Sequence, residues 1–294
     1  MVHKKGPAVG QHGKWWGPRC NQPVLAIHGW QDNAGTFDTL APLLTNERIS
    51  VLCIDLPGHG HSSHYPKGHS YYIFWDGVNI VRRLVQRFKW ERITILGHSL
   101  GGCIAFLYAS IYPNDIKSYV AIDIVSPIPK NCETFLDNLG KQIDTFLSYE
   151  TRSYKDYSYH VLSETIFNGY RNSLTEKSVD ILLKRGAKSS GQNEGLFNFS
   201  TDIRLKSPGV SFFTIEQILQ HASRIKCNVL ILKASNGIQY DNLEYYDSTV
   251  SKIAKSTNSC EHHVVEGTHH VHLNNPERVL PFIVTFLDNQ LSDF

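Results

Sequence analysis

The sequence predicts an α/β fold in which a mainly parallel sheet is covered by helices on both faces. Two observations support this prediction: short apolar segments alternate with helix-like segments, and a glycine-flanked serine lies where one apolar segment gives way to a helix. Strands buried on both faces read as continuous apolar runs, because helices cover both sides of a parallel sheet. The segments expected as strands are 24–27, 49–54, 93–96, 119–122, 229–232 and 263–265.

The length and charge of the chain limit its class. Its 294 residues, of which 41% are hydrophobic, can form one large α/β domain with an insertion. A net charge of +2 is too small to indicate a nucleic acid or an anionic membrane as partner. No apolar stretch approaches the roughly 20 residues that a membrane span needs. We therefore expect a small-molecule partner and no membrane span.

The six cysteines show no paired spacing, which predicts free thiols and a reducing intracellular compartment. The N-terminus lacks the apolar region of a secretory signal. The C-terminal Ser292–Asp293–Phe294 is not the peroxisomal tripeptide. These features favour a cytoplasmic protein.

Residues 97–101 read Gly-His-Ser-Leu-Gly, which is the G-x-S-x-G pattern of a nucleophile elbow. The pattern lies between the β-branched run 92–96 and the helix-like stretch 102–112. A very tight strand-to-helix turn needs glycines beside the serine, because other side chains would collide across the turn. The pattern also occurs by chance, but the strand before it and the helix after it favour catalysis. We predict that Ser99 is a nucleophile.

The loop after the first parallel strand is the expected position of an oxyanion hole. The apolar run 23–27 ends in His-Gly-Trp, so a strand breaks at its carboxyl end into a glycine-containing loop. We predict that the backbone N–H groups of Trp30 and of Leu100, the residue after the nucleophile, hold the oxyanion. The simpler alternative is that Gly29 only makes a turn and that Trp30 packs under the loop.

A histidine near the end of the chain completes the pattern. The expected strand 260–265 is followed by a Gly-Thr break and then by His269, seven residues before Pro276. This proline occupies the favoured first position of a helix that we expect to continue to Asp288. The order serine then histidine differs from the orders of the chymotrypsin and subtilisin families. We predict His269 as the general base. The alternatives in the same segment are His270 and His272.

These motifs resemble the AB-hydrolase-1 family of α/β-hydrolases over nearly the whole chain. Three segments carry the resemblance: His-Gly-Trp-Gln-Asp-Asn at 28–33, Asp-Leu-Pro-Gly-His-Gly-His-Ser-Ser at 55–63, and the serine segment 97–102. Within the family they look similar to the serine hydrolase-like proteins related to insect kraken. The resemblance implies the α/β-hydrolase fold, a Ser-His-acid triad, and hydrolysis of an ester, thioester or amide without a cofactor.

The triad acid departs from the common family pattern. In most members it follows the strand that corresponds to 229–233, yet here that strand runs into Ala-Ser-Asn-Gly without a carboxylate. Asp123 ends the expected strand 119–122, where some members place the acid. We favour Asp123 and keep Asp241 as the alternative, although either carboxylate could instead cap a loop or helix. Asp55 is less favoured because its turn is mostly structural in this family.

The segment 126–210 differs from the alternating pattern on either side. It is rich in Tyr, Ser and Lys, with helical stretches expected at 134–146 and 178–184 and a Gly/Ser turn at 186–195. We interpret it as a helical cap inserted into the core. Its aromatic residues either line an apolar acyl pocket or form the cap's own core. The core then comprises the two segments 1–125 and 211–294.

The start of the chain is a second departure from the family. The fold usually opens with an antiparallel hairpin, yet residues 1–14 show little alternation and leave only 14–16 as a strand stub. We therefore expect the first edge strand to be missing or irregular.

Several histidines near the C-terminus invite a metal site, but no acidic or cysteine partner lies at ligand spacing. We therefore predict no metal and no cofactor. The histidines are His262, His263, His269, His270 and His272.

Two other functions use the same fold. One is a non-enzymatic ligand-binding or scaffold protein, which the displaced acid favours and the complete glycine-serine pattern disfavours. The other is a cofactor-free lyase or haloperoxidase that reuses the triad. A serine nucleophile argues against epoxide hydrolase and dehalogenase chemistry, which form their ester intermediate on a carboxylate.

Overall fold

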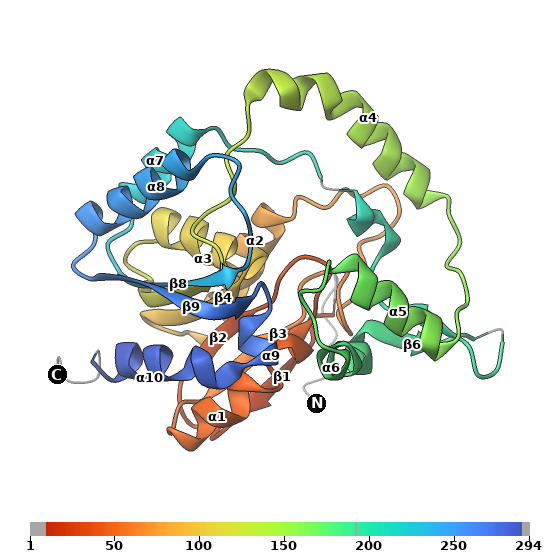
Figure 1. The fold of residues 1–294 in the computed structure, drawn as a ribbon, viewed down its shortest axis with the longest axis horizontal. Helices are drawn as coiled ribbons and strands as arrows, with labels where there is room; N and C mark the ends of the chain where they lie inside the picture. The colour runs from red at the N-terminus through yellow and green to blue at the C-terminus, as the bar shows by residue number, and fades with distance from the viewer. Residues whose placement is uncertain (1–9, 192, 208, 290–294) are drawn as a thin grey trace.

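A seven-stranded sheet forms the centre of the protein (Figure 1). The computed structural model describes residues 10–191, 193–207 and 209–289. The strand order is β1-β3-β2-β4-β5-β8-β9; β1 runs antiparallel to β3, and the other neighbours run parallel. This arrangement confirms the predicted α/β fold. The strands are β1 (Gly13–Trp16), β2 (Val24–Ile27), β3 (Val51–Ile54), β4 (Ile93–His98), β5 (Ile116–Ile122), β8 (Asn228–Asn236) and β9 (Cys260–Thr268).

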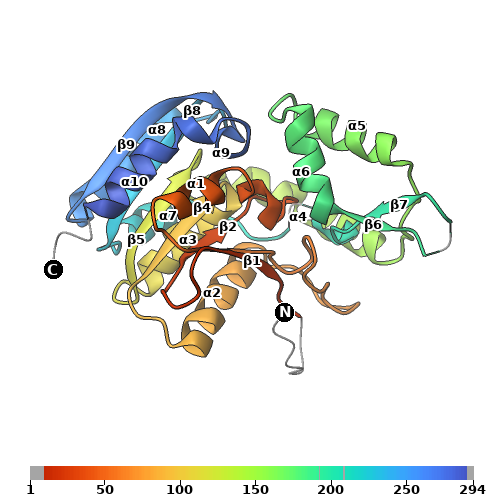
Figure 2. The same cartoon turned by 90° about the horizontal axis from the view of Figure 1, so that it is seen from below.

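Helices cover both faces of the sheet (Figure 2). Leu25 and Ile27 of β2 point to one buried cluster, whereas Val24 and Ala26 point to the other. Because successive side chains of a strand face opposite sides, a strand covered on both sides must be apolar throughout. The first cluster includes α2 (Phe74–Phe88), α3 (Leu100–Ile111), α7 (Ile215–Ala222) and α8 (Leu243–Ser256), and the second includes α1 (Leu40–Asn46), α9 (Val271–Asn274) and α10 (Leu280–Asp288).

The register of the parallel strands brings several loops to one edge of the sheet. Ile27 at the end of β2 pairs with Gly97 of β4. His98 at the end of β4 pairs with Ile122 of β5, which in turn pairs with Leu232 of β8. The residues that follow β2, β4 and β5 therefore lie side by side at the carboxyl edge.

The edge strand at the start of the chain is short. β1 pairs with β3 from Gly13 to Trp16, so the strand stub expected at 14–16 is present. Residues 1–9, which carry most of the irregular sequence before it, lie outside the described residues.

The segment between β5 and α7 adds no strand to the main sheet. Figures 1 and 2 show its helices to one side of the sheet. Its aromatic residues Tyr157, Phe167, Tyr170, Phe197 and Phe199 pack against a small apolar cluster around Leu162, Val179 and Leu182. These aromatics thus contribute to the segment's own core. Its elements are α4 (Cys132–Glu150), α5 (Tyr159–Gly169), α6 (Glu176–Gly186), the hairpin β6 (Ala187–Ser189) and β7 (Phe197–Phe199), and the 3-10 turn η2 (Ile203–Lys206).

The cysteines and the hydropathy of the helices complete the description of the fold. All six cysteines are free. No helix within the described residues is long and apolar enough to cross a membrane.

A buried ion pair ties the inserted segment to the core. Arg185 of α6 binds Asp55, which follows β3 and is fully buried. Asp55 also accepts hydrogen bonds from the backbone N–H of Ala34 at 2.8 Å and of His61 at 2.9 Å. Burial opposes ionisation, but the Arg185 guanidinium and the Ala34 N–H together lower the pKa of Asp55 below its usual value. These contacts support a structural role for Asp55.

We expect Arg185→Met to destabilise the fold by about 3–5 kcal/mol at pH 7, because it leaves the Asp55 carboxylate buried without its cation. Urea unfolding measures the change. Since the pKa of Asp55 is lowered on folding, the stabilisation is present at neutral pH and is lost as the pH falls through the folded-state pKa. The difference in free energy of unfolding between wild type and Arg185→Met should therefore become smaller at acidic pH.

The matched control is Arg87→Met, which removes an exposed cation from the last turn of α2. It should change the free energy of unfolding by no more than about 0.5 kcal/mol. Equal stabilities of wild type and Arg185→Met at pH 7 would contradict the structural role of this ion pair.

Candidate active site

Ser99 occupies a strained turn between β4 and α3. Its φ of 50° and ψ of −114° lie outside the regions that a serine normally adopts. The flanking glycines make the turn possible, since a Cβ at Gly97 would clash with the backbone of Gly101 and a Cβ at Gly101 would clash with the carbonyl of Ile27. The side chain of Ser99 is partly exposed. This is the geometry that the G-x-S-x-G pattern predicts.

The structure brings Asp123 and His269 together. His269 follows β9, and its Nδ1 lies 2.7 Å from Oδ2 of Asp123, which follows β5. Asp123 is fully buried, whereas 20% of the His269 side chain is exposed. A neutral His269 that donates its Nδ1–H to the carboxylate keeps the lone pair of Nε2 available to accept a proton.

Three further donors hold the carboxylate of Asp123. Oδ1 accepts from Lys233 Nζ at 2.6 Å and from the Ala234 N–H at 3.0 Å, and Oδ2 accepts from the Ile238 N–H at 2.7 Å. A Cβ at Gly237 would overlap this carboxylate. Asp123 therefore fills the space beside the loop after β8, where most family members carry their acid.

Lys233 was not anticipated from the sequence. It comes one residue after Leu232, which pairs with Ile122, and Asp123 comes one residue after Ile122. The signal was thus a cation and a carboxylate at equivalent positions, each directly after the apolar run of its strand. Only the register, which the sequence does not give, places the two charges in contact.

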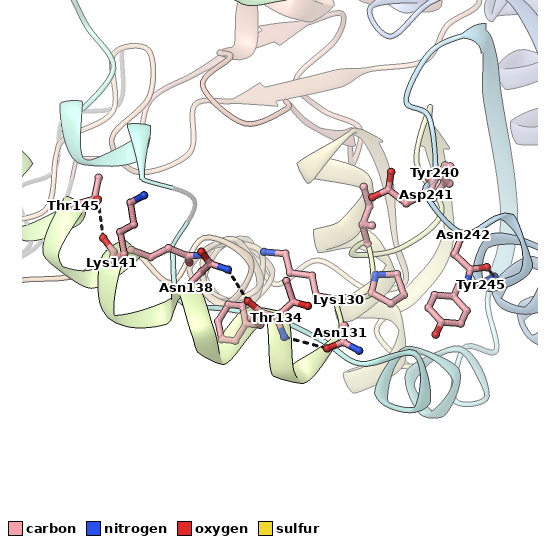
Figure 3. A pocket seen from close by; sticks show the side chains of 14 residues that line it. Lys130, Asn131, Thr134, Asn138, Lys141, Thr145, Tyr240, Asp241, Asn242 and Tyr245 are labelled. Atoms are coloured by element: carbon pink, nitrogen blue, oxygen red, sulfur yellow. Dashed lines mark hydrogen bonds between the residues drawn. The ribbon is translucent and has the colours of Figure 1, made fainter.

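Asp241 lies elsewhere. It is exposed and lines an open cavity of about 740 Å³ between α4 and the start of α8, together with Lys130, Thr134 and Tyr245 (Figure 3). The N-cap of α8 is Asn242, whose side chain accepts from the Tyr245 N–H at 3.2 Å. The helix-cap explanation for Asp241 is therefore wrong by one residue.

The predicted oxyanion residues flank Ser99. Leu100 is the first residue of α3, and the first N–H groups of a helix have no intrahelical acceptor. The loop that contains Trp30 passes close to the serine, because a Cβ at Gly29 would lie 3.3 Å from the Cβ of Ser99. The side chain of Trp30 packs against the core. The Trp30 ring can therefore pack against the core while the Trp30 backbone N–H serves the predicted oxyanion hole.

The other two histidines of this segment have different partners. His270 Nδ1 lies 2.7 Å from Ser173 Oγ, and His272 Nε2 lies 2.9 Å from Thr36 Oγ1. Both are buried, and burial lowers the pKa of each imidazole below its usual value. Of the three, His269 is the one that contacts Asp123.

His98, the residue before the serine, is also fully buried. Its Nε2–H donates to the His269 carbonyl at 2.9 Å and so fixes the backbone of that residue. Burial lowers the pKa of His98 well below its usual value. Asp32 lies beside it with 1% exposure. Burial opposes ionisation of this carboxylate, but contact with His270 lowers its pKa. Their spacing along the chain does not predict that Asp32, His98 and His270 lie together.

The remaining histidines of the C-terminal group lie on β9. His262 Nε2 is 2.9 Å from the Tyr246 hydroxyl, and His263 Nε2 is 3.4 Å from Glu261 Oε2. The five C-terminal histidines are close in sequence but lie in two places. His262 and His263 are part of the sheet, whereas His269, His270 and His272 lie at its carboxyl edge.

Known proteins resemble this chain in sequence and structure. The family profile described as alpha/beta hydrolase fold matches residues 22–174. A Drosophila melanogaster protein named "Probable serine hydrolase" is 40% identical over 93% of this chain and 83% of its own length. A Danio rerio "Serine hydrolase-like protein" is 38% identical over 96% of this chain and 86% of its own length.

Solved structures agree with the fold. A hypothetical protein from Pseudomonas aeruginosa PAO1 superimposes with a TM-score of 0.84 at 25% identity and covers 98% of this chain and 99% of its own. A thioesterase domain from the curacin biosynthetic pathway gives a TM-score of 0.76 at 20% identity over 94% of this chain and 99% of its own, a likeness of fold alone. The predicted resemblance to the serine hydrolase-like proteins is confirmed, and the chain belongs to the α/β hydrolase fold family.

Proposed function

We propose that the protein is a serine hydrolase that cleaves a carboxylic ester or a related acyl substrate through an acyl-enzyme. Ser99 is the nucleophile, His269 the general base and Asp123 the acid. The observation that carries the proposal is the 2.7 Å contact between His269 Nδ1 and Asp123 at the sheet edge that also presents the strained Ser99. The names of the fly and zebrafish relatives support hydrolase chemistry.

The first half of the reaction forms the acyl-enzyme. Nε2 of His269 accepts the Ser99 hydroxyl proton while Oγ bonds to the substrate carbonyl carbon. The carbonyl oxygen becomes an oxyanion, which the N–H groups of Trp30 and Leu100 stabilise. The imidazolium then gives its proton to the leaving group as the bond to the carbonyl carbon breaks.

The second half releases the acid. Water gives a proton to His269 and attacks the acyl carbon, after which the imidazolium returns the proton to Ser99 Oγ. Within the described residues Ser99 Oγ has no hydrogen-bond partner. This agrees with a site in which the hydrogen bond between nucleophile and base tightens when substrate binds.

We assign residues 126–210 to a cap and residues 1–125 and 211–294 to the hydrolase core. The separate apolar cluster of the inserted segment supports this division. The six free cysteines support a reducing compartment such as the cytoplasm. The partner is then a small acyl compound, and the reaction written above uses no metal or cofactor.

Ser99→Ala should abolish covalent labelling by a fluorophosphonate and lower kcat by about a thousandfold or more, because only binding and the oxyanion hole then act on the substrate. Labelling is followed by mass spectrometry, and kcat by a panel of p-nitrophenyl and acyl-CoA esters of varied chain length. Ser251→Ala, an exposed position on α8, is the control and should label normally. Undiminished turnover in folded Ser99→Ala would exclude the triad.

Asp123→Asn should lower kcat by up to about ten-thousandfold with the fold intact, because an amide no longer selects the Nδ1–H tautomer of His269. Asp241→Asn is the matched control, since its carboxylate is exposed and its loss should leave kcat within about twofold. Ester turnover and far-UV circular dichroism of both variants decide the result. A loss of kcat in Asp241→Asn alone would show that Asp241, not Asp123, is the acid.

Lys233→Met should lower kcat/KM by about tenfold, because the buried carboxylate of Asp123 loses the Lys233 ammonium that donates to its Oδ1 at 2.6 Å and helps to hold it against His269. Ester turnover measures the change.

Two further variants complete this comparison. Lys233→Arg keeps a charged donor and should retain most of the wild-type kcat/KM, as should Lys252→Met at an exposed position on α8. An unchanged kcat/KM in folded Lys233→Met would show that the lysine does not position Asp123.

A further inference from the structure

Three buried side chains converge behind the proposed active site. Asp32 lies in the loop after β2, His98 ends β4, and His270 follows β9; each is 1% exposed. Oδ2 of Asp32 lies 3.8 Å from His98 Nδ1 and 3.7 Å from His270 Nε2. All three atoms lie within 4.8 Å of one another. Three elements that are distant in sequence thus aim a carboxylate and two imidazoles at one point.

Two of these atoms lack a hydrogen bond. Asp32 Oδ2 and His98 Nδ1 are buried and have no partner among the described residues. Oδ1 of Asp32 accepts from the Asn33 N–H at 2.9 Å, so the free oxygen is the one that faces the histidines. Buried polar atoms without a partner are costly and rare, and each calls for an explanation. The cluster therefore has the character of a ligand site.

The outer nitrogens of both imidazoles are held by the protein. His98 Nε2–H donates to the His269 carbonyl at 2.9 Å, which leaves the lone pair of Nδ1 directed at the centre of the cluster. His270 Nδ1 lies 2.7 Å from Ser173 Oγ, which orients its ring in the same way. Metal-binding histidines characteristically have such outer hydrogen bonds, which fix the ring and the tautomer.

We propose that Asp32, His98 and His270 form a binding site for a divalent transition metal of the Zn²⁺ class. Imidazole nitrogens and a carboxylate oxygen are ligands that this class accepts. Bonds of about 2.0–2.2 Å in tetrahedral geometry hold ligand atoms about 3.4 Å apart. The two distances from Asp32 Oδ2, 3.8 and 3.7 Å, must therefore shorten by a few tenths of an ångström, and the two histidine nitrogens, which lie within 4.8 Å of one another, by up to about 1.4 Å. A cation also balances the buried charge of Asp32. Ligand spacing in the sequence predicted no metal, and that pattern included neither Asp32 nor His98.

The site is separate from the proposed catalytic groups, because it uses neither Ser99, His269 nor Asp123. It would join the loop after β2, the end of β4 and the segment after β9. Metal binding should therefore raise the melting temperature by mass action, whatever the protein hydrolyses. A buried water with the same partners is the competing explanation for the cluster.

The test is metal binding to the full chain after chelator treatment and gel filtration. We expect one Co²⁺ per chain, with visible d–d absorption that stoichiometric Zn²⁺ abolishes, and one equivalent of Zn²⁺ by elemental analysis. Asp32→Asn should abolish the signal. Ser173→Ala, which removes the outer hydrogen bond to the His270 ring and the bond that Ser173 Oγ accepts from the His270 N–H, should weaken Zn²⁺ binding by about 10–100-fold in competition with a chromophoric chelator.

The matched control is His263→Asn, which removes a surface histidine beside Glu261 and should leave binding unchanged. Absence of stoichiometric Co²⁺ or Zn²⁺ would overturn the proposal and leave a buried water. Equal binding by wild type and Ser173→Ala would place the metal elsewhere and overturn it too. If Asp32→Asn does not fold, Ser173→Ala and His263→Asn still decide between these results.

Discussion

The carboxylate of Asp123 is the interaction on which the arrangement of this site depends. It is fully buried, and its donors come from the end of β8, from the loop that follows β8 and from the residue after β9. A buried carboxylate is stable only when its oxygens are hydrogen bonded, so the ends of β5, β8 and β9 must keep their relative positions. The same carboxylate holds Nδ1 of His269 at 2.7 Å and so orients its ring.

The carboxyl edge of the sheet also leaves little room for side chains. Gly237 has no side chain where the Asp123 carboxylate lies. Gly97 has none where the backbone of Gly101 passes, and Gly101 has none where the elbow meets the carbonyl of Ile27 at the end of β2. The proposed acid, Asp123, and the proposed nucleophile, Ser99, therefore depend on neighbours that contribute only backbone. Substituting these glycines would disturb the site through steric overlap, without changing any chemical group that takes part in it.

The sequence predicted the sheet and its functional edge because both follow from local signals. The strand expected at 24–27 agrees with β2 residue for residue. Strand β5 begins at Ile116, earlier than the sequence predicts. Lys117 and Ser118 interrupt the apolar pattern and so hide this part of the strand, although Ser118 is buried and contacts Thr94. Asp123 could be placed near His269 from strand order alone, since parallel strands share one carboxyl edge.

The remaining features depend on tertiary contacts. The helix expected from Pro276 to Asp288 divides into the 3-10 turn Pro276–Arg278 and α10, because Pro281 lacks an N–H and favours a new helix start. Helix α5 was missed because Leu162 is its only fully buried residue, so its apolar pattern is weak. The contacts of Lys233 and Asp32 depend on register and loop path, which residue spacing does not specify.

The inserted segment is held to the core more firmly at α6 than at α4, which affects how molecules reach the sheet edge. Helix α6 is fixed to the core through Arg185, whereas Phe135 is the only buried residue of α4, and Leu136, Ile143 and Leu147 on α4 are exposed. Helix α6 should therefore be harder to displace from the core than α4. We expect an approaching acyl compound to pass on the α4 side, where an apolar helix surface can yield without breaking a buried ion pair.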